Sequence, residues 1–354
     1  MNTAKLSLTG LVVTGLTTLL ATPALAQDKT HQDKSPRDSA VTIDPAIAPY
    51  SKVSGVSGTL NSIGSDTLNN LMTLWAEGFQ KLYPSIKIQI EGKGSATAPP
   101  ALIAGTAQLG PMSRAMKQSE IDEFEKKYHY QPTVFRVAVD ALAVYVHKDN
   151  PLQKLTLPEV DAIFSKGRTG GFAKDLSSWG LLGLEGDFAD KSIRIYGRNS
   201  ASGTYGYFKE HALFKGDFKD SVKEQPGSAA VVQAVTEDPY GIGYSGIGYR
   251  TSGVRPLLIA EKAGAPYVGV DEESVYSNKY KLARFLFVYI NKAPDRPLDP
   301  LVGEFLRFVV SAAGQQIVVK DGYLPLKAKM VEKELEKLGT AAGTAPSEAG
   351  AKKG

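Results

Sequence analysis

The chain has 354 residues, of which 42% are hydrophobic and 22% are charged. These values are typical of a soluble globular protein that is long enough for two domains and a sizeable core. The formal net charge of +4 is too small to make nucleic acid or an anionic membrane the main partner, and a chain without cysteine can form neither a disulfide nor a lipid-modified N-terminal cysteine.

The first 26 residues have the pattern of a secretory signal peptide. Lys5 supplies the positive charge, residues 6–20 form a short apolar run, and Ala24-Leu25-Ala26 matches a cleavage site. Loss of this segment removes one lysine and changes the net charge to +3. We therefore expect a mature chain that begins at Gln27 and is exported, to a bacterial periplasm or alternatively to the medium. An uncleaved anchor helix is the other interpretation, but the apolar run is short for a membrane span.

Polar segments flank a folded body at residues 55–338. Residues 27–54 are polar, charged and interrupted by proline, which predicts a flexible leader. Residues 339–354 consist mostly of alanine, glycine, proline and serine with closing lysines, which predicts a disordered tail.

The folded body repeats one structural unit, which consists of a short strand, a loop of small polar residues and a helix. The first unit has a strand at 58–63, the turn Gly64-Ser65-Asp66-Thr67, and a helix whose apolar residues recur every three or four positions. Those apolar residues are Leu68, Leu71, Met72, Trp75, Phe79 and Leu82. Two further units follow, with strands at 86–90 and 107–110, loops at 92–97 and 111–114, and helices that end near 104 and 130. This order is typical of a parallel α/β sheet.

In open α/β sheets, ligands bind at the carboxyl ends of the strands, beside the starts of the helices. We therefore expect the loops at 65–67, 95–97 and 113–114 to meet at one edge of the sheet. Serine and threonine also cap helices for purely local reasons, so each loop taken alone has that simpler explanation.

The stretch 197–208 combines several groups that bind anions. It joins a short strand to the start of a helix, where unpaired backbone N–H groups and the positive end of the dipole lie. Ser202 and Thr204 add hydroxyl groups, and Gly203 lets the backbone approach a ligand closely. Arg198 adds a permanent cation whose planar fork of donors matches an oxyanion. The alternative interpretation is a capped helix beside a surface arginine.

The apolar run 134–146 predicts a buried strand, and Asp140 interrupts it. A buried carboxylate is costly unless it is paired. Asp140 therefore pairs with an arginine such as Arg198, accepts a proton from the ligand, or lies exposed at the end of the strand.

The sequence offers oxyanion donors but no recognisable pair of catalytic base and nucleophile. The four histidines are scattered without the spacing of metal ligands, and neither a phosphate-loop lysine motif nor G-x-S-x-G occurs. Gly241, Gly243 and Gly246 fit G-x-G-x-x-G, but the residues that follow do not predict a helix, so we reject a nucleotide site. We expect a binding protein rather than an enzyme, without catalytic residues, cofactor or metal.

Over roughly residues 55–328 the chain resembles PstS-like proteins, the substrate-binding components of phosphate ABC transporters. The motifs that carry the resemblance occur in the order found in that family. They are Gly64-Ser65-Asp66-Thr67-Leu68, Gly94-Ser95 before an Ala-Leu helix, the turn from Gly110 to Arg114, Asp140 before an apolar strand, Arg198 with Ser202-Gly203-Thr204, Gly241-Ile242-Gly243-Tyr244, and Gly314-Gln315 with Gly322-Tyr323-Leu324-Pro325-Leu326. The motif from Arg198 to Thr204 is the specific part.

The resemblance implies an α/β, two-lobed periplasmic binding-protein fold of type II, with crossover strands near 139–147 and 284–291. Lobe one would comprise residues 55–140 and 285–338, and lobe two residues 141–284. It also implies inorganic phosphate in the interlobe cleft, a membrane ABC transporter permease as partner, and a monomer. The residues expected to hold phosphate are Ser65, Thr67, Ser95, Ser113, Arg198, Ser202, Gly203 and Thr204, with Arg114 and Asp140 as further candidates.

The sequence departs from the family pattern at two positions. Some members accept the proton of phosphate with an aspartate in the turn where Ser113 and Arg114 stand here, and many have an acid in place of Gln108. Selection of phosphate over sulfate would then be weaker, or would depend on Asp140. Because the family's proton-accepting position lies elsewhere, we expect Asp140 to orient Arg198. A receptor for sulfate, tungstate or another oxyanion, and a phosphatase on the same fold, are the alternative functions.

Overall fold

The computed structural model describes residues 41–339. The predicted signal peptide, the first part of the predicted leader and the predicted tail from residue 340 on lie outside the described residues.

A mixed sheet with the strand order β3-β11-β4-β8-β6-β7 forms the centre of the fold, and β9 also pairs with β4. Its strands are β3 (Gly110–Met112), β4 (Thr133–His147), β6 (Arg194–Arg198), β7 (Lys223–Gln225), β8 (Gly241–Gly246), β9 (Val254–Pro256) and β11 (Ala283–Ile290). The long strand β4 is buried over most of its length, as its apolar run predicts. It runs antiparallel to β11, β8 and β9, whereas β6 is parallel to β7 and β8. The expectation of a parallel sheet is therefore correct for only part of the fold.

The first lobe is the group of elements around β1 to β3. Strand β1 (Thr59–Ile63) pairs in parallel with β2 (Lys87–Glu91), and Ser62 forms a parallel bridge to Leu109 just before β3. The helical segments of this lobe are η1 (Asp66–Leu68), α1 (Asn69–Leu82), η2 (Ser95–Thr97), α2 (Ala98–Ala104), α3 (Gln118–Tyr128), α8 (Pro300–Val310), α9 (Ala312–Lys320) and α10 (Ala328–Leu338). The predicted repeat of strand, loop and helix is confirmed here.

Helix α1 shows why the sequence folds this way. Leu71, Met72, Trp75 and Phe79 recur at helical spacing and are fully buried, which removes their apolar surface from water. The indole N–H of Trp75 donates to the carbonyl oxygen of Gly314 at 2.9 Å, so the polar end of this large side chain is also satisfied.

The second lobe is the group of elements between the two strands that cross between lobes. It contains a two-stranded parallel sheet of β5 (Lys154–Thr156) and β10 (Leu258–Ala260). Its helical segments are α4 (Leu157–Phe164), η3 (Trp179–Leu182), η4 (Gly186–Phe188), α5 (Gly203–His211), α6 (Ser228–Glu237), η5 (Ile247–Tyr249) and α7 (Glu272–Tyr276). The G-x-G-x-x-G pattern falls on strand β8 rather than on a strand-to-helix turn, in agreement with our rejection of a nucleotide site.

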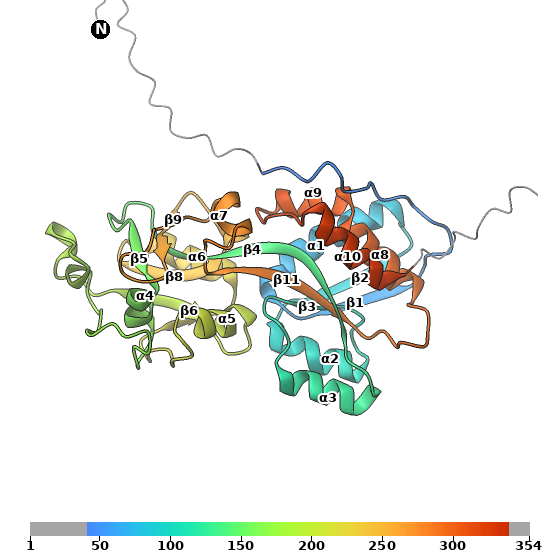
Figure 1. Ribbon diagram of the computed structural model, residues 1–354, viewed down its shortest axis with the longest axis horizontal. Helices are drawn as coiled ribbons and strands as arrows, with labels where there is room; N and C mark the ends of the chain where they lie inside the picture. The colour runs from blue at the N-terminus through green and yellow to red at the C-terminus, as the bar shows by residue number, and fades with distance from the viewer. Residues whose placement is uncertain (1–40, 340–354) are drawn as a thin grey trace, which may run out of the picture. The chain divides into compact units, whose positions relative to one another are not determined.

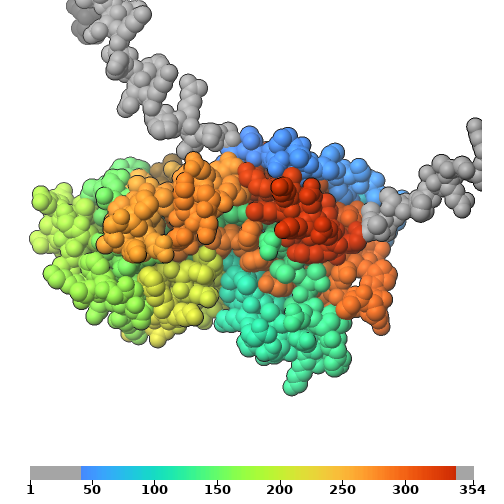
Figure 2. All heavy atoms as spheres, viewed as in Figure 1, coloured from blue at the N-terminus to red at the C-terminus, as the bar shows by residue number. Residues whose placement is uncertain are grey.

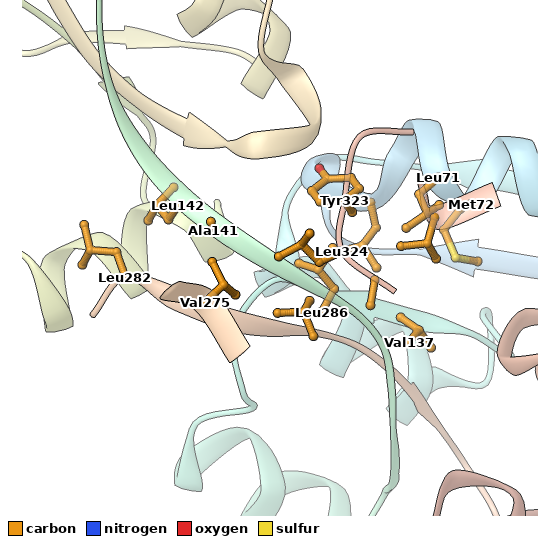
Figure 3. Packing of buried hydrophobic residues seen from close by; sticks show 14 of the residues in the cluster. Leu71, Met72, Val137, Ala141, Leu142, Val275, Leu282, Leu286, Tyr323 and Leu324 are labelled. Carbon is orange, nitrogen blue, oxygen red and sulfur yellow. The ribbon is translucent and has the colours of Figure 1, made fainter. Parts of the chain in front are cut away.

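Strands β4 and β11 run side by side from one lobe to the other (Figure 1). Their antiparallel pairing extends from Ala141 opposite Ala283 to Thr133 opposite Ile290. Figure 3 shows Leu286 of β11 near Leu324, which follows α9. The backbone of Leu324 also exchanges two hydrogen bonds with Val139, at 2.9 and 3.0 Å. The crossing strands are thus part of a continuous hydrophobic core.

The segment at residues 44–54 corrects the prediction of a flexible leader. It has little regular structure, but Asp44 accepts a hydrogen bond from the backbone of Ala328 at 3.0 Å, and Ala48 accepts one from Ala312 at 2.9 Å. Ile47 is buried, and Tyr50 donates to Glu304 at 3.0 Å. Figure 2 shows this segment in blue along the red C-terminal helices. The segment is therefore anchored by residues more than 250 positions away in the sequence, which a local pattern does not reveal.

Two further details concern helices. Helix α3 begins at Gln118, and the carboxylate of Glu120 accepts from the backbone of Lys117 at 2.8 Å. No single helix of the described part of the chain is long and apolar enough to span a membrane, although the bent pair α8 and α9 passes that test jointly on length and composition.

Candidate anion-binding site

Three loops of the first lobe meet at the carboxyl ends of β1, β2 and β3, as the sequence predicts. The backbone N–H of Ser65 donates to the carbonyl oxygen of Pro111 at 2.8 Å, which fixes the first loop against the third. The Oγ atom of Ser113 lies 3.1 Å from Oγ of Ser65 and 3.3 Å from Oγ of Ser95. All three serines are buried. The first lobe therefore presents a connected group of buried hydroxyls.

The second lobe contributes the start of helix α5. The Oγ atom of Ser202 accepts hydrogen bonds from the backbone of Thr204 at 3.2 Å and Tyr205 at 3.3 Å, as an N-cap residue does. The hydroxyl of Thr204 meets the hydroxyl of Thr67 from the first lobe at 2.8 Å. We call Ser65, Thr67, Ser95, Ser113, Ser202 and Thr204 the hydroxyl cluster. Its members come from both lobes, so it forms only when the lobes are together.

The lobes approach each other closely at Gly203. A Cβ atom at this position would lie 2.2 Å from Oγ of Ser95 and 2.6 Å from Oγ of Ser113, which is too close for any side chain in this arrangement. Nearby, the backbone N–H of Ala96 in the first lobe donates to the carbonyl oxygen of Ala201 in the second at 3.1 Å. Glycine at 203 is therefore required by the space between the lobes, as the sequence argument on close approach expected.

Arg198 lies at the end of β6 with 2% of its side chain exposed. Its Nη1 donates to Oγ of Ser228 at 2.8 Å and lies 3.0 Å from Oδ2 of Asp66, which belongs to the first lobe. Its backbone N–H donates to the hydroxyl of Tyr244 at 3.1 Å. The Nε atom is buried and has no hydrogen-bond partner among the described residues. An unpaired buried donor on a cation is costly, and a bound anion removes that cost.

Asp140 does not orient Arg198, which corrects our preferred interpretation. Its Oδ2 atom accepts from Nε and Nη2 of Arg284 at 2.9 and 2.8 Å, and its Oδ1 accepts from the backbone of Ile247 at 2.9 Å. The physical reason is register, since Asp140 in β4 stands opposite Arg284 in β11. Asp140 is also fully buried, so the interpretation as an exposed strand end is wrong.

Arg114, a predicted site residue, pairs with a carboxylate outside the hydroxyl cluster. Its guanidinium forms a two-pronged pair with Glu120, with Nη1 and Nη2 at 2.7 and 2.6 Å from the two carboxylate oxygens. It lines a surface cavity of about 610 Å³ together with Tyr207 and Arg284. Gln108 also lies apart, since its side-chain oxygen accepts from the backbone of Asn61.

Sequence reasoning missed three residues that complete this arrangement. They are Asp66 and Ser228, which contact Arg198, and Arg284, whose Nη2 donates to Oγ1 of Thr204 at 2.9 Å and whose Nη1 donates to the carbonyl oxygen of Ser113 at 2.8 Å. The signal for Arg284 was its charge within an otherwise apolar strand. The signal for Asp66 was its place between two predicted ligand residues.

The buried Tyr323 and the partly buried Tyr249 both donate hydrogen bonds to the loop after β1. Burial raises the pKa of Tyr249 and of Tyr323 well above the ordinary range, so both hydroxyls stay protonated and act as donors. Tyr249 donates to the carbonyl oxygen of Asp66 at 2.9 Å, and Tyr323 donates to that of Thr67 at 2.9 Å. The side chains of this loop are therefore free to face the site.

Comparisons with known proteins show the family of the chain. Residues 51–313 match the model of the PBP superfamily domain. The phosphate-binding protein PstS of Pseudomonas aeruginosa is 58% identical over 301 residues, which cover 85% of this chain and 93% of that protein. Protein SphX of Synechococcus elongatus is 27% identical and covers 80% of this chain and 82% of its own length.

Solved structures show the same fold. A putative phosphate ABC transporter substrate-binding protein with bound phosphate from Clostridium perfringens has a TM-score of 0.65 at 25% identity and covers 76% of this chain and 100% of its own. An ABC-type phosphate transport receptor from Vibrio cholerae has a TM-score of 0.58 at 22% identity and covers 75% of this chain and 100% of its own. The chain belongs to the PBP superfamily and, within it, to the PstS phosphate-binding proteins.

Proposed function

We propose that this protein is an exported receptor that captures inorganic phosphate between its two lobes and delivers it to a membrane ABC transporter. The observation that carries the proposal is the buried Nε of Arg198, which has no hydrogen-bond partner within residues 41–339. A guanidinium binds a tetrahedral oxyanion through two neighbouring donors. Because Nη1 of Arg198 is held by Asp66 and Ser228, its Nε edge remains available for such a ligand.

The hydroxyl cluster supplies the further donors that a phosphate with four oxygens needs. Ser202 illustrates the arrangement, because its oxygen already accepts from two backbone N–H groups and its own proton can be donated to a ligand. Arg284 has a similar effect on Thr204, since it donates to that oxygen and leaves the hydroxyl proton to point elsewhere. We assign phosphate contacts to Arg198, to Gly203 and to the hydroxyl cluster.

Closure follows from the same contacts. We place the lobe boundaries within the crossing strands, with lobe one at residues 55–140 and 285–338 and lobe two at 141–284. A ligand that contacts both lobes binds the closed state better and shifts the population toward it. We further propose cleavage after Ala26, a periplasmic location, a permease as the partner of the closed form, and a monomeric receptor.

The enzyme alternative is not favoured. Among the described residues, the hydroxyls of the cluster contact one another, arginine or backbone groups rather than a histidine or carboxylate base. The PstS relative is a phosphate-binding protein, and the Vibrio cholerae structure is that of a phosphate transport receptor. A receptor for another oxyanion remains the second candidate, because most donors of the site suit any tetrahedral anion.

Isothermal titration of the mature protein with phosphate, sulfate and tungstate at matched ionic strength tests the proposal. We expect one phosphate per protein, with weaker binding of the other anions and no turnover of p-nitrophenyl phosphate. Small-angle scattering should show a smaller radius of gyration with saturating phosphate than without it. Binding of sulfate or tungstate in place of phosphate would establish the second candidate, and turnover would establish an enzyme.

A further inference from the structure

Asp66 joins the two lobes at a point beside the proposed ligand. It lies in the loop after β1 in the first lobe, and its Oδ2 is 3.0 Å from Nη1 of Arg198 in the second. The same oxygen accepts from the backbone N–H of Ser228, the first residue of helix α6, at 2.7 Å. One carboxylate oxygen of the first lobe therefore contacts two groups of the second lobe, the guanidinium of Arg198 as an ion pair and the N–H of Ser228 as a hydrogen bond.

We propose that Asp66 is a closure latch that also positions Arg198 for the ligand. This inference rests on the proposed function, because it concerns how the same site gains affinity. In the closed state Asp66 and Ser228 hold Nη1 of Arg198 from one side. The guanidinium then cannot rotate freely, and its Nε edge stays directed toward the oxyanion.

The surroundings favour the latch. A carboxylate at the start of a helix is stabilised by the helix dipole and by the unpaired N–H groups there, and α6 offers both to Asp66. The second lobe also binds the backbone of the same residue, since Tyr249 donates to the carbonyl oxygen of Asp66. Gly227 permits the close approach, because a Cβ atom there would lie 2.9 Å from Oδ1 of Asp66.

If Asp66 is a latch, removing its charge should change the affinity for the anion in the direction opposite to that expected from its electrostatic field alone. Removing a negative charge near an anion site should tighten anion binding if the charge acts only through its field. Removing a latch should weaken binding, because the closed state loses an interlobe ion pair and Arg198 loses its support. The variant Asp66→Asn separates the two, since it changes the charge and keeps nearly the same size.

Stopped-flow kinetics and titration of Asp66→Asn test the latch. We expect the dissociation rate of phosphate to rise at least about tenfold, while the association rate changes little, because the latch forms after the ligand has entered. Affinities for phosphate and sulfate should fall by a similar factor. Asp66→Ala, which also removes the acceptor for Ser228, should show at least as large a loss. Thermal melting checks that both variants are folded.

Glu91→Gln is the matched control. Glu91 ends β2 in the same lobe, is about half exposed and pairs with Lys93 at 2.8 Å, so its change removes one negative charge without touching the second lobe. Its affinity should remain that of the wild type or increase slightly.

Several outcomes of these measurements would contradict the latch. Unchanged or tighter binding by Asp66→Asn would overturn the latch, and so would a slower association with an unchanged dissociation rate. Weaker phosphate binding with tighter sulfate binding would instead make Asp66 an acceptor of the ligand's proton. If wild-type protein fails to bind phosphate but binds sulfate or tungstate, the proposed function fails and the latch is measured with that anion. If wild-type protein binds none of the three, both proposals fail.

Discussion

Two arginine–aspartate pairs with buried arginines lie within the same site, and they differ in how many of the arginine nitrogen atoms have hydrogen-bond partners. All three nitrogen atoms of Arg284 donate hydrogen bonds, to Asp140, to the carbonyl of Ser113 and to the hydroxyl of Thr204. In Arg198, Nη1 is paired with the second lobe's Ser228 and the first lobe's Asp66, whereas the buried Nε has no partner among the described residues.

This difference in hydrogen bonding suggests that the Arg284 pair has a structural role and that Arg198 has a role in ligand binding. A buried ion pair whose donors and acceptors are all satisfied stabilises a particular arrangement of the chain, here the register of the crossing strands. A buried cation with an unpaired donor can form a further hydrogen bond to a ligand. We therefore expect changes at the first pair to act mainly on folding and changes at the second mainly on binding.

The largest effect should come from Asp140→Ala. Removing one partner of a buried pair leaves the charge of Arg284 uncompensated, which typically costs about 3–5 kcal/mol of unfolding free energy. Urea denaturation measures the loss. Asp149→Ala is the control, because Asp149 is an exposed carboxylate at the end of the same strand and should change stability by less than about 0.5 kcal/mol. A loss as small as the control's would contradict the structural role.

Arg198→Ala should act on the ligand instead. Hydrogen bonds to charged groups contribute about 1.5–3 kcal/mol, so phosphate affinity should fall at least about tenfold while the fold persists. The carboxylate of Asp66 is 22% exposed and can be hydrated after the change. Arg194→Ala on the same strand is the control, since Arg194 pairs with Asp238 and is half exposed. Equal titration curves for wild type and Arg198→Ala would remove Arg198 from the site.

Gly203→Ala should weaken binding by a smaller amount. The added methyl group would meet Ser95 and Ser113 across the lobes, and such overpacking typically costs about 1–3 kcal/mol, of which rotation of the serines recovers a part. The closed state should suffer and the unliganded fold should not, so scattering should show less contraction with phosphate. Gly206→Ala in the same helix is the control, because its methyl group would make an ordinary contact of 3.4 Å with Arg114.

The smallest effect concerns a carboxylate that lacks a cation partner within the described chain. Burial raises the pKa of Asp321 to about 6, although the hydrogen bond from Asn70 opposes that rise. Between about pH 4 and 6 the folded protein then binds a proton that the unfolded chain has released, so stability falls as the pH increases through this window. Partial exposure screens the charge and limits the fall to at most about 1 kcal/mol.

Asp321→Asn should remove this pH dependence, as urea denaturation at pH 4, 5 and 6 would show. Asp122→Asn, on the exposed face of α3, should retain it. A slope that persists in Asp321→Asn would mean that another group titrates in this range.

Local patterns predicted much of the fold. The helix predicted from the apolar spacing of Leu68 to Leu82 is confirmed, because that pattern depends on residues within one or two helical turns of each other. The anchored segment near Ile47 was missed because its contacts come from helices at the other end of the chain. The mixed character of the sheet was missed for the same reason, since β11 returns to β4 from more than 130 residues away.

In the site, too, contiguous motifs were predicted correctly, whereas contacts between distant segments were not. The motif from Arg198 to Thr204 is contiguous, and the structure places its residues together. Asp140 received the wrong partner because only the register of β4 and β11 brings Arg284 opposite to it. We included Arg114 among the site residues because it follows Ser113 directly, but its guanidinium pairs with Glu120. Ser113 and Arg114 lie in a bend after β3, and the sequence does not say which of two adjacent side chains in such a bend faces the ligand.

The contact between Ala96 and Ala201 has a consequence for comparing receptors of this kind. Because it joins two main-chain atoms, only a change that removes the N–H of residue 96, such as Ala96→Pro, deletes it, and an alanine scan of the site cannot detect its contribution. Relatives that differ in every hydroxyl of the cluster can still keep this link between the lobes. The preference for one anion over another can therefore change during evolution while the lobes continue to close in the same way.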